Sequence, residues 1–165
     1  MWTRTDLLKL LGIEHPIIQA PMSGIATPDL AAAVSNAGAL GSLGCGILPG
    51  AAIREQLTAT QRATNRPINA NFFAHPLPSH DDEAAQHMRD RLHGYYDEVG
   101  LGPVPQPGEP FPTFDQARLD IVLELRPKVV SFHFGLPDTK NRAAAERGRL
   151  YSLVLGYHRL RSTAA

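Results

Sequence analysis

The sequence has few cysteines, no net charge and no long hydrophobic run. Its single cysteine, Cys45, cannot form an intrachain disulfide, which is typical of proteins from a reducing compartment. Sixteen Lys and Arg residues balance sixteen Asp and Glu residues, so no overall charge attracts the chain to nucleic acid or to a membrane surface. No apolar run reaches the roughly 18 residues of a membrane span, and the polar N-terminus lacks the apolar stretch of a secretory signal. These absences predict a cytoplasmic protein that binds neither nucleic acid nor membranes.

Motifs for several kinds of chemistry are also missing. His80, His87 and His93 lie in a polar stretch without Cys or carboxylate partners at metal-ligand spacing, so we expect them at the surface and predict no metal site. The sequence contains no Walker loop, no GxGxxG fingerprint, no Ser-His-Asp order and no paired carboxylates. Nucleotide-dependent phosphoryl transfer and triad hydrolysis are therefore not indicated.

Short apolar runs alternate with helical segments along much of the chain. We expect strands at 16–20, 39–43, 67–73 and 128–135, and helices at 28–37, from 49 onward and at 114–125. The triplet Thr27-Pro28-Asp29 predicts a helix start, because Thr caps the helix, Pro needs no N–H bond at the first position, and Asp favours the positive end of the dipole. Buried strands that alternate with helices are typical of a parallel sheet.

Two segments depart from this alternation. Residues 76–113 predict an insertion, with a polar helix at 81–98 followed by a loop rich in Pro and Gly. Residues 138–165 predict a helical or irregular tail, in which 150–155 has the composition of a fifth strand. This tail has an excess of basic residues, which either form a solvated chain end or bind a partner.

In a parallel α/β barrel, ligands bind at the carboxyl ends of the strands. This rule selects the segments 20–23, 44–46, 71–75 and 133–137. Within them, Cys45 has two interpretations: a buried thiol, or a reactive thiol near the helix that begins at Pro49.

Three segments resemble one enzyme family. They are HPIIQAPMSGIATPDLAAAVSNAGALGSLG at 15–44, PINANF at 67–72 and VVSFHFGLP at 129–137, and they resemble the nitronate monooxygenases, formerly called 2-nitropropane dioxygenases. The resemblance implies a TIM-type (β/α)8 barrel that binds FMN and oxidises alkyl nitronates with O2. It implies flavin contacts at Ala20, Pro21, Met22 and Asn71.

His133 is the catalytic candidate within the chain. It lies near the carboxyl end of the fourth expected strand, where an imidazole can orient a substrate anion or stabilise negative charge on a reduced flavin. The alternative is a hydrogen-bonded histidine of the barrel core without a catalytic role.

An intact barrel needs roughly 250 residues. We therefore expect a truncated barrel of about the first four or five βα units, with residues 1–137 as its N-terminal half and residues 138–165 as a tail unlike the family. The resemblance places the family's Gly-Gly-His segment, with its catalytic histidine, and the loops that bind the flavin phosphate beyond this chain. Two alternatives stay open. One is a non-catalytic fragment that forms a homo-oligomer through its unpaired strand edges, and the other is a flavin-dependent NAD(P)H reductase, because flavin-type enoyl-ACP reductases begin similarly.

Overall fold

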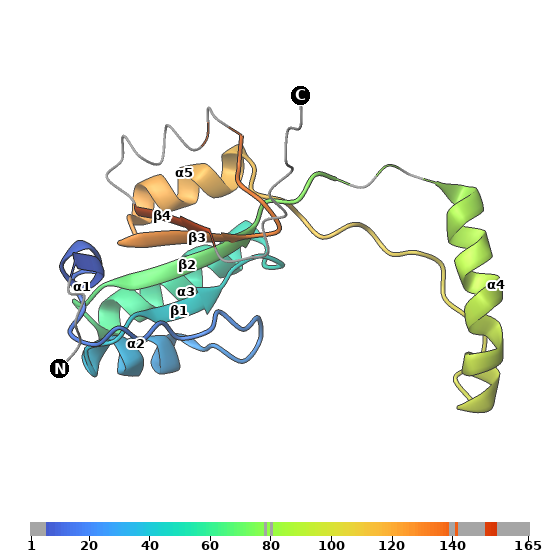
Figure 1. Cartoon of the computed structure of the whole chain (residues 1–165), viewed down its shortest axis with the longest axis horizontal. Coiled ribbons are helices and arrows are strands. Elements are labelled where there is room, and N and C mark those ends of the chain that lie inside the picture. Colours follow the sequence, from blue (N-terminus) through green and yellow to red (C-terminus); the bar gives the residue numbers. More distant parts are fainter. Residues whose placement is uncertain (1–5, 78, 80, 139–140, 142–150, 155–165) are drawn as a thin grey trace, which may run out of the picture. The chain divides into compact units, whose positions relative to one another are not determined.

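The computed structural model describes residues 6–77, 79, 81–138, 141 and 151–154. Its sheet has four parallel strands in the order β1 (Gly41–Gly44), β2 (Ile68–Phe73), β3 (Val129–His133) and β4 (Tyr151–Val154), which Figure 1 shows side by side. The helices of the described residues are α1 (Asp6–Leu11), α2 (Pro28–Asn36), α3 (Gly50–Ala63), α4 (Asp82–Glu98) and α5 (Gln116–Leu125). The structure confirms an α/β fold with a parallel sheet. β4 lies within the segment 150–155, whereas most of 138–149 and all of 155–165 lie outside the described residues.

The expected first strand is reduced to a single parallel bridge between Ile18 and Leu40. In a longer ladder the backbone N–H of residue 21 would donate to the carbonyl of Ser42, but Pro21 has no N–H. The Gln19 side chain takes over this role: its Nε2 donates to the Ser42 carbonyl and its Oε1 accepts from the Ser42 N–H, both at 3.2 Å. The segment 16–20 therefore lies beside β1 through an amide side chain rather than through a regular strand.

One face of the sheet packs against helices. Alternate side chains of β2 and β3, among them Phe72 and Phe132, join residues of α2, α3 and α5 in the main hydrophobic cluster. Phe114 stands between them, with ring centroids 5.1 Å from Phe72 and 5.0 Å from Phe132 in edge-on geometry. The three rings fix the helices to the centre of the sheet.

The opposite face of the sheet carries buried polar side chains. Ser42, Asn69, Asn71 and Ser131 alternate with the helix-facing residues and are all buried. Parallel strands are usually apolar on both faces, so this row of amides and hydroxyls is unusual in a sheet core. Because these groups are buried, they need hydrogen-bond partners.

At the beginning of the strands, this face becomes apolar. Leu11 of α1 and Ile13 pack with Leu40 and Val129 in a second buried cluster. Gly12 ends α1 in a left-handed conformation with φ +72°, as a helix-terminating glycine does. The short helix α1 thus closes the starting end of the sheet.

The helices begin at caps that the sequence encodes locally. Thr27 Oγ1 accepts from the Leu30 N–H at 3.2 Å, which confirms the predicted start of α2. Asp81 and Asp115 cap α4 and α5 in the same way, at 2.9 Å. Helix α3 follows Pro49, as expected, with no side-chain cap bond.

Residues Pro76–Phe111 form a second compact unit, which contains α4 and overlaps the expected insertion at 76–113. No residue of α4 is buried. Among the described residues, none of the helices is long and apolar enough to cross a membrane.

Candidate active site

The register between β2 and β3 brings the candidate residues together. Asn71 pairs with Ser131 and Phe73 pairs with His133, so Asn71 and His133 emerge on the same face at the carboxyl ends of adjacent strands. Asn71 and Ser131 are buried, and the ring of His133 is half-buried. This is the end of a parallel sheet at which α/β enzymes bind their ligands.

Asn71 links Ser131 to His133 through hydrogen bonds. Its Nδ2 donates to Ser131 Oγ at 2.8 Å, and its Oδ1 lies 3.0 Å from His133 Nδ1. Because an amide oxygen only accepts, the imidazole must carry its proton on Nδ1 for this bond to form. In the neutral ring Nε2 is then the basic nitrogen, and it is the atom that can gain a proton.

A second polar pair lies one step closer to the start of the strands. Asn69 Nδ2 donates to Ser42 Oγ at 3.1 Å. Asn69 Oδ1 is buried and has no hydrogen-bond partner in the described part of the chain. A buried acceptor without a partner costs about 1–3 kcal/mol, and such groups need a functional or structural explanation.

A cluster of aromatic rings reaches His133 through Phe134. The Phe134 centroid lies 6.0 Å from that of His133 and 5.2 Å from that of Phe73, and the ring of His75 lies 6.3 Å from Phe134. Phe134 is 66% exposed and has φ +68°, a left-handed conformation that non-glycine residues rarely adopt. Strained, exposed aromatic residues of this kind gather at ligand sites rather than in cores.

The glycine that follows fixes this turn. Gly135 has φ +144°, and a Cβ at this position would lie 2.9 Å from the carbonyl oxygen of Ala74. The Ala74 N–H donates to the carbonyl of His133 at 2.9 Å. The chain after β3 therefore turns tightly against the end of β2, which holds Phe134 beside the imidazole.

Three of the four family-derived flavin contacts, Ala20, Pro21 and Met22, belong to a segment beside the end of β1. Ser23 Oγ donates to the Gly44 carbonyl at 3.3 Å, and a Cβ on Gly44 would lie 2.6 Å from the Ser23 backbone nitrogen. Gly44 in turn pairs with Asn71 in the sheet. The register thus places the segment 20–23 one strand away from Asn71.

This segment offers free backbone donors. The N–H groups of Ala20 and Met22 donate to no acceptor in the described part of the chain, and Met22 is 42% exposed. Pro21 prevents this stretch from joining the sheet. Two N–H groups without an acceptor among the described residues, one strand away from Asn71, fit the acceptor-rich edge of a flavin ring.

Asn71 has fewer hydrogen-bonding positions available for a flavin than a free asparagine side chain has. Both ends of its amide are already used by Ser131 and His133, and the residue is 2% exposed. One hydrogen of Nδ2 and one lone pair of Oδ1 are left for another partner. The structure therefore gives Asn71 a second role, the orientation of His133.

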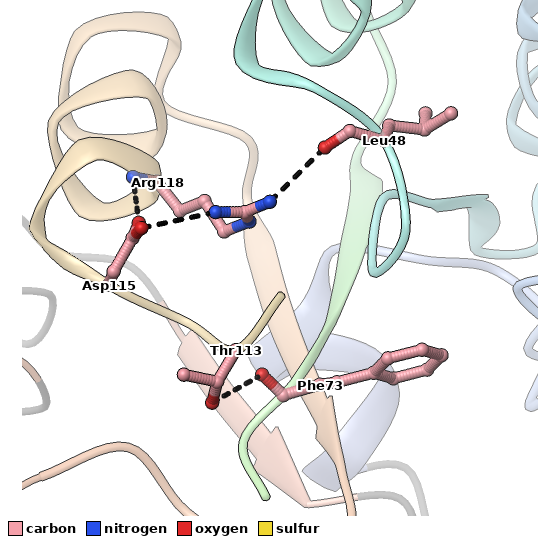
Figure 2. A network of polar contacts seen from close by, with 5 residues as sticks. All are labelled: Leu48, Phe73, Thr113, Asp115 and Arg118. Carbon is pink, nitrogen blue, oxygen red and sulfur yellow. Dashed lines mark hydrogen bonds and ion pairs between the residues drawn. The ribbon is translucent and has the colours of Figure 1, made fainter. Parts of the chain in front are cut away.

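Figure 2 shows the contacts that hold this end of the sheet together. Arg118 of α5 donates from Nη2 to the Leu48 carbonyl at 3.3 Å and pairs through Nη1 with Asp115 at 3.2 Å. Thr113 Oγ1 donates to the Phe73 carbonyl at 3.4 Å. Arg118 thus ties the loop after β1 to the first turn of α5. Neither Arg118 nor Asp115 stands out in the sequence as a site residue, because the i, i+3 spacing of this pair is common on helices.

Cys45 is a buried thiol, as one of the two interpretations predicted. It packs in the hydrophobic cluster on the helix-facing side, and burial raises the pKa of its thiol to about 12. Its backbone N–H donates to the Asn71 carbonyl at 2.8 Å. A thiol with this pKa is protonated at neutral pH, so the reactive-thiol interpretation is wrong.

Comparisons with known proteins show the family of the chain. The family model described as "Nitronate monooxygenase" matches residues 4–155. A nitronate monooxygenase of Paraburkholderia phytofirmans is 44% identical over 133 residues, which cover 79% of this chain and 36% of the relative. One of Pseudomonas aeruginosa is 41% identical over 134 residues, which cover 78% of this chain and 37% of the relative. The chain thus spans little more than a third of the length of these relatives.

Solved structures show the same relationship. A nitroalkane oxidase from Streptomyces ansochromogenes superimposes with a TM-score of 0.71 and 32% identity, over 90% of this chain and 41% of that protein. A FabK mutant from Thermotoga maritima superimposes with a TM-score of 0.64 at 24% identity, over 92% of this chain and 39% of that one, which shows similarity of fold. The family model and the relatives together show that the chain belongs to the nitronate monooxygenase family.

Proposed function

We propose that this chain provides part of the active site for the FMN-dependent oxidation of alkyl nitronates by O2. Its family membership and the geometry at the carboxyl ends of β1 to β3 support the proposal. The observation that carries it is the hydrogen bond from His133 Nδ1 to Asn71, which fixes the tautomer of a half-buried imidazole at the ligand-binding end of the sheet.

We also infer that the sheet is the first part of a (β/α)8 barrel. The strands are parallel and follow one another in sequence order, as they do in such a barrel. Helices cover one face, while the other carries the buried row of Ser42, Asn69, Asn71 and Ser131. In a closed barrel this second face would be the interior.

Flavin binding in this proposal rests on Ala20, Pro21, Met22 and Asn71. The free N–H groups of Ala20 and Met22 would donate to the acceptors of the ring edge, and Pro21 keeps this segment out of the sheet. When bound, FMN supplies the electron-accepting chemistry, and the protein contributes position and electrostatics. Met22 adds an exposed, adaptable apolar side chain beside the ring.

His133 would act on the substrate. With Nδ1–H held by Asn71, a proton gained by the ring resides on Nε2, and the resulting imidazolium donates to an anionic nitronate. Phe134 packs beside the imidazole, and Phe73 packs against Phe134, so the ion pair would have an apolar wall on one side.

The test is turnover by a His133→Gln variant. Nitronate-dependent O2 uptake in the presence of FMN should fall by about 10²–10³-fold, as it does when an enzyme loses one preorganised donor to an anion, while FMN affinity is unchanged. His93→Gln is the matched control, because His93 is an exposed histidine of α4 that pairs with Asp97, and its uptake should equal that of the wild type.

Two results would contradict the proposal. Equal nitronate-dependent O2 uptake by His133→Gln and the wild type would show that His133 is a core histidine without a catalytic role. Bleaching of the flavin band by NAD(P)H, without nitronate-dependent uptake, would favour a reductase instead.

A further inference from the structure

A cavity lies at the opposite end of the sheet from the candidate active site. It has a volume of about 430 Å³ and is formed where the chain enters β2 and β3. The residues that line it are Gly12, Gln61, Thr64, Asn65, Arg66, Pro67, Ile68, Arg126, Pro127 and Lys128. The volume lies within the range of roughly 300–1,000 Å³ that is typical of small-molecule sites.

The cavity is built by two helix-to-strand loops held side by side. One connects α3 to β2 and the other connects α5 to β3. Asn69 pairs with Val129 in the parallel register. The two loops that lead into these positions therefore lie next to each other at the starting end of the sheet. Gln61 reinforces this arrangement, because its Nε2 donates to the Leu125 carbonyl at the end of α5 at 2.6 Å.

The lining is basic. Arg66, Arg126 and Lys128 contribute three cations, and the described residues that line the cavity include no carboxylate. Glu14 accepts from Arg66 Nη2 at 2.9 Å, but both side chains are half exposed, so water screens this pair. The amides of Gln61 and Asn65 add uncharged hydrogen-bonding groups beside the cations.

Arg126 occupies a position that favours glycine. It caps the C-terminus of α5 with φ 49° and ψ 54°, in the left-handed region. Helices usually place Gly there, because a Cβ is strained in this conformation. Arg126 lines the cavity, and its Nε donates to the Leu123 carbonyl of its own helix at 3.4 Å. Residues held in rare conformations gather at functional sites.

We propose that this cavity is a binding site for a phosphate-bearing small molecule. Guanidinium groups match phosphate oxygens with paired, charge-assisted hydrogen bonds, and Lys128 adds a point charge. Cations also stabilise the negative ends of α3 and α5, but that effect requires neither a cavity nor a strained arginine. The site lies away from the carboxyl ends of the strands, so it does not depend on the proposed nitronate chemistry.

The test is a calorimetric titration of the full chain with inorganic pyrophosphate at constant ionic strength. The wild type should show saturable binding to one site. Arg126→Gly should weaken it at least tenfold without lowering the thermal midpoint of the free protein, because glycine relieves the left-handed strain. Lys128→Gln should also weaken binding. Arg62→Gln is the matched control, since this exposed arginine of α3 does not line the cavity, and its Kd should change less than twofold.

Three outcomes would overturn the proposal. The first is an absence of saturable binding to the folded wild type. The second is an equal Kd in the wild type, Arg126→Gly and Lys128→Gln. The third is equally tight binding of citrate, which would make the cavity a general anion site without preference for phosphate.

Discussion

Asn71 joins the buried polar row of the sheet to the candidate catalytic imidazole. Its two hydrogen bonds, to Ser131 and to His133, use both ends of one amide. A leucine of similar size would satisfy neither partner, and it would leave Ser131 Oγ without a donor at a position shielded from water.

We therefore expect Asn71→Leu to lower the free energy of unfolding by about 1–3 kcal/mol. In the same variant, NMR spectra of the His133 imidazole should lose the preference for a proton on Nδ1. Unchanged ring-nitrogen signals would show that Asn71 does not set the tautomer. The exposed His93 serves as an internal control in both spectra.

Cys45 makes stability depend on pH in the alkaline range. Burial raises its pKa from 9.0 to about 12, so between these values the unfolded chain has lost a proton that the folded chain keeps. Stability is then fully present below pH 9 and is lost as the pH rises toward 12. The slope contributed by this thiol is at most about 1.4 kcal/mol per pH unit.

Urea denaturation of the wild type and of Cys45→Ala between pH 8 and pH 11 isolates this contribution, because other titrating groups are common to both proteins. The difference in unfolding free energy should shift steadily in favour of Cys45→Ala as the pH rises. A difference that is independent of pH would mean that the native thiol ionises as it does in the unfolded chain.

Helix α2 packs directly against strand β1 at a glycine, Gly41. A Cβ on Gly41 would lie 1.9 Å from the Ala31 carbonyl oxygen and 2.7 Å from Ser35 Oγ. Ser35 Oγ also donates to the Pro67 carbonyl at 2.8 Å and accepts from the Gly41 N–H at 3.0 Å. The helix can approach the strand this closely only because residue 41 has no side chain.

Gly41→Ala should therefore destabilise the protein by about 2 kcal/mol or more, measured by chemical denaturation. The control is Gly94→Ala in α4, where a Cβ meets nothing within 4 Å and should stabilise the helix by about 0.5–1 kcal/mol. Equal stability of Gly41→Ala and the wild type would contradict the close packing of α2 on β1.

The elements with local signals could be predicted from the sequence. Thr27-Pro28-Asp29 encodes the start of α2, and the apolar run before His133 encodes β3. The segment 16–20 has the composition of a strand, but its pairing depends on the missing N–H of Pro21 and on the side chain of Gln19. Composition does not show that an amide side chain will replace a backbone donor.

At the scale of the whole molecule, the family and the parallel sheet could be predicted, but the contacts within the site could not. The bond between Asn71 and His133 joins residues 62 positions apart, and the unit Pro76–Phe111 lies between them in the sequence. Only the register of β2 against β3 brings the two side chains together. The basic cavity depends on the same register at the other end of the strands.

In the proposed function, the ends of β1 and β2 and the segment 20–23 form a flavin site. Gly44 touches this segment: a Cβ at this position would lie 2.6 Å from the Ser23 backbone nitrogen, so a side chain there would displace Ser23. Gly44→Ala should therefore move the donors of Ala20 and Met22 out of place while leaving His133 and its bond to Asn71 unchanged.

The most direct measurement is a titration of FMN fluorescence with the full 165-residue chain. We predict saturable binding of one FMN per chain, weakened at least tenfold by Gly44→Ala and unchanged by His93→Gln. Circular dichroism of each variant checks that the fold is retained. An absence of saturable quenching with the folded wild type, or equal affinity in the wild type and Gly44→Ala, would contradict the flavin site.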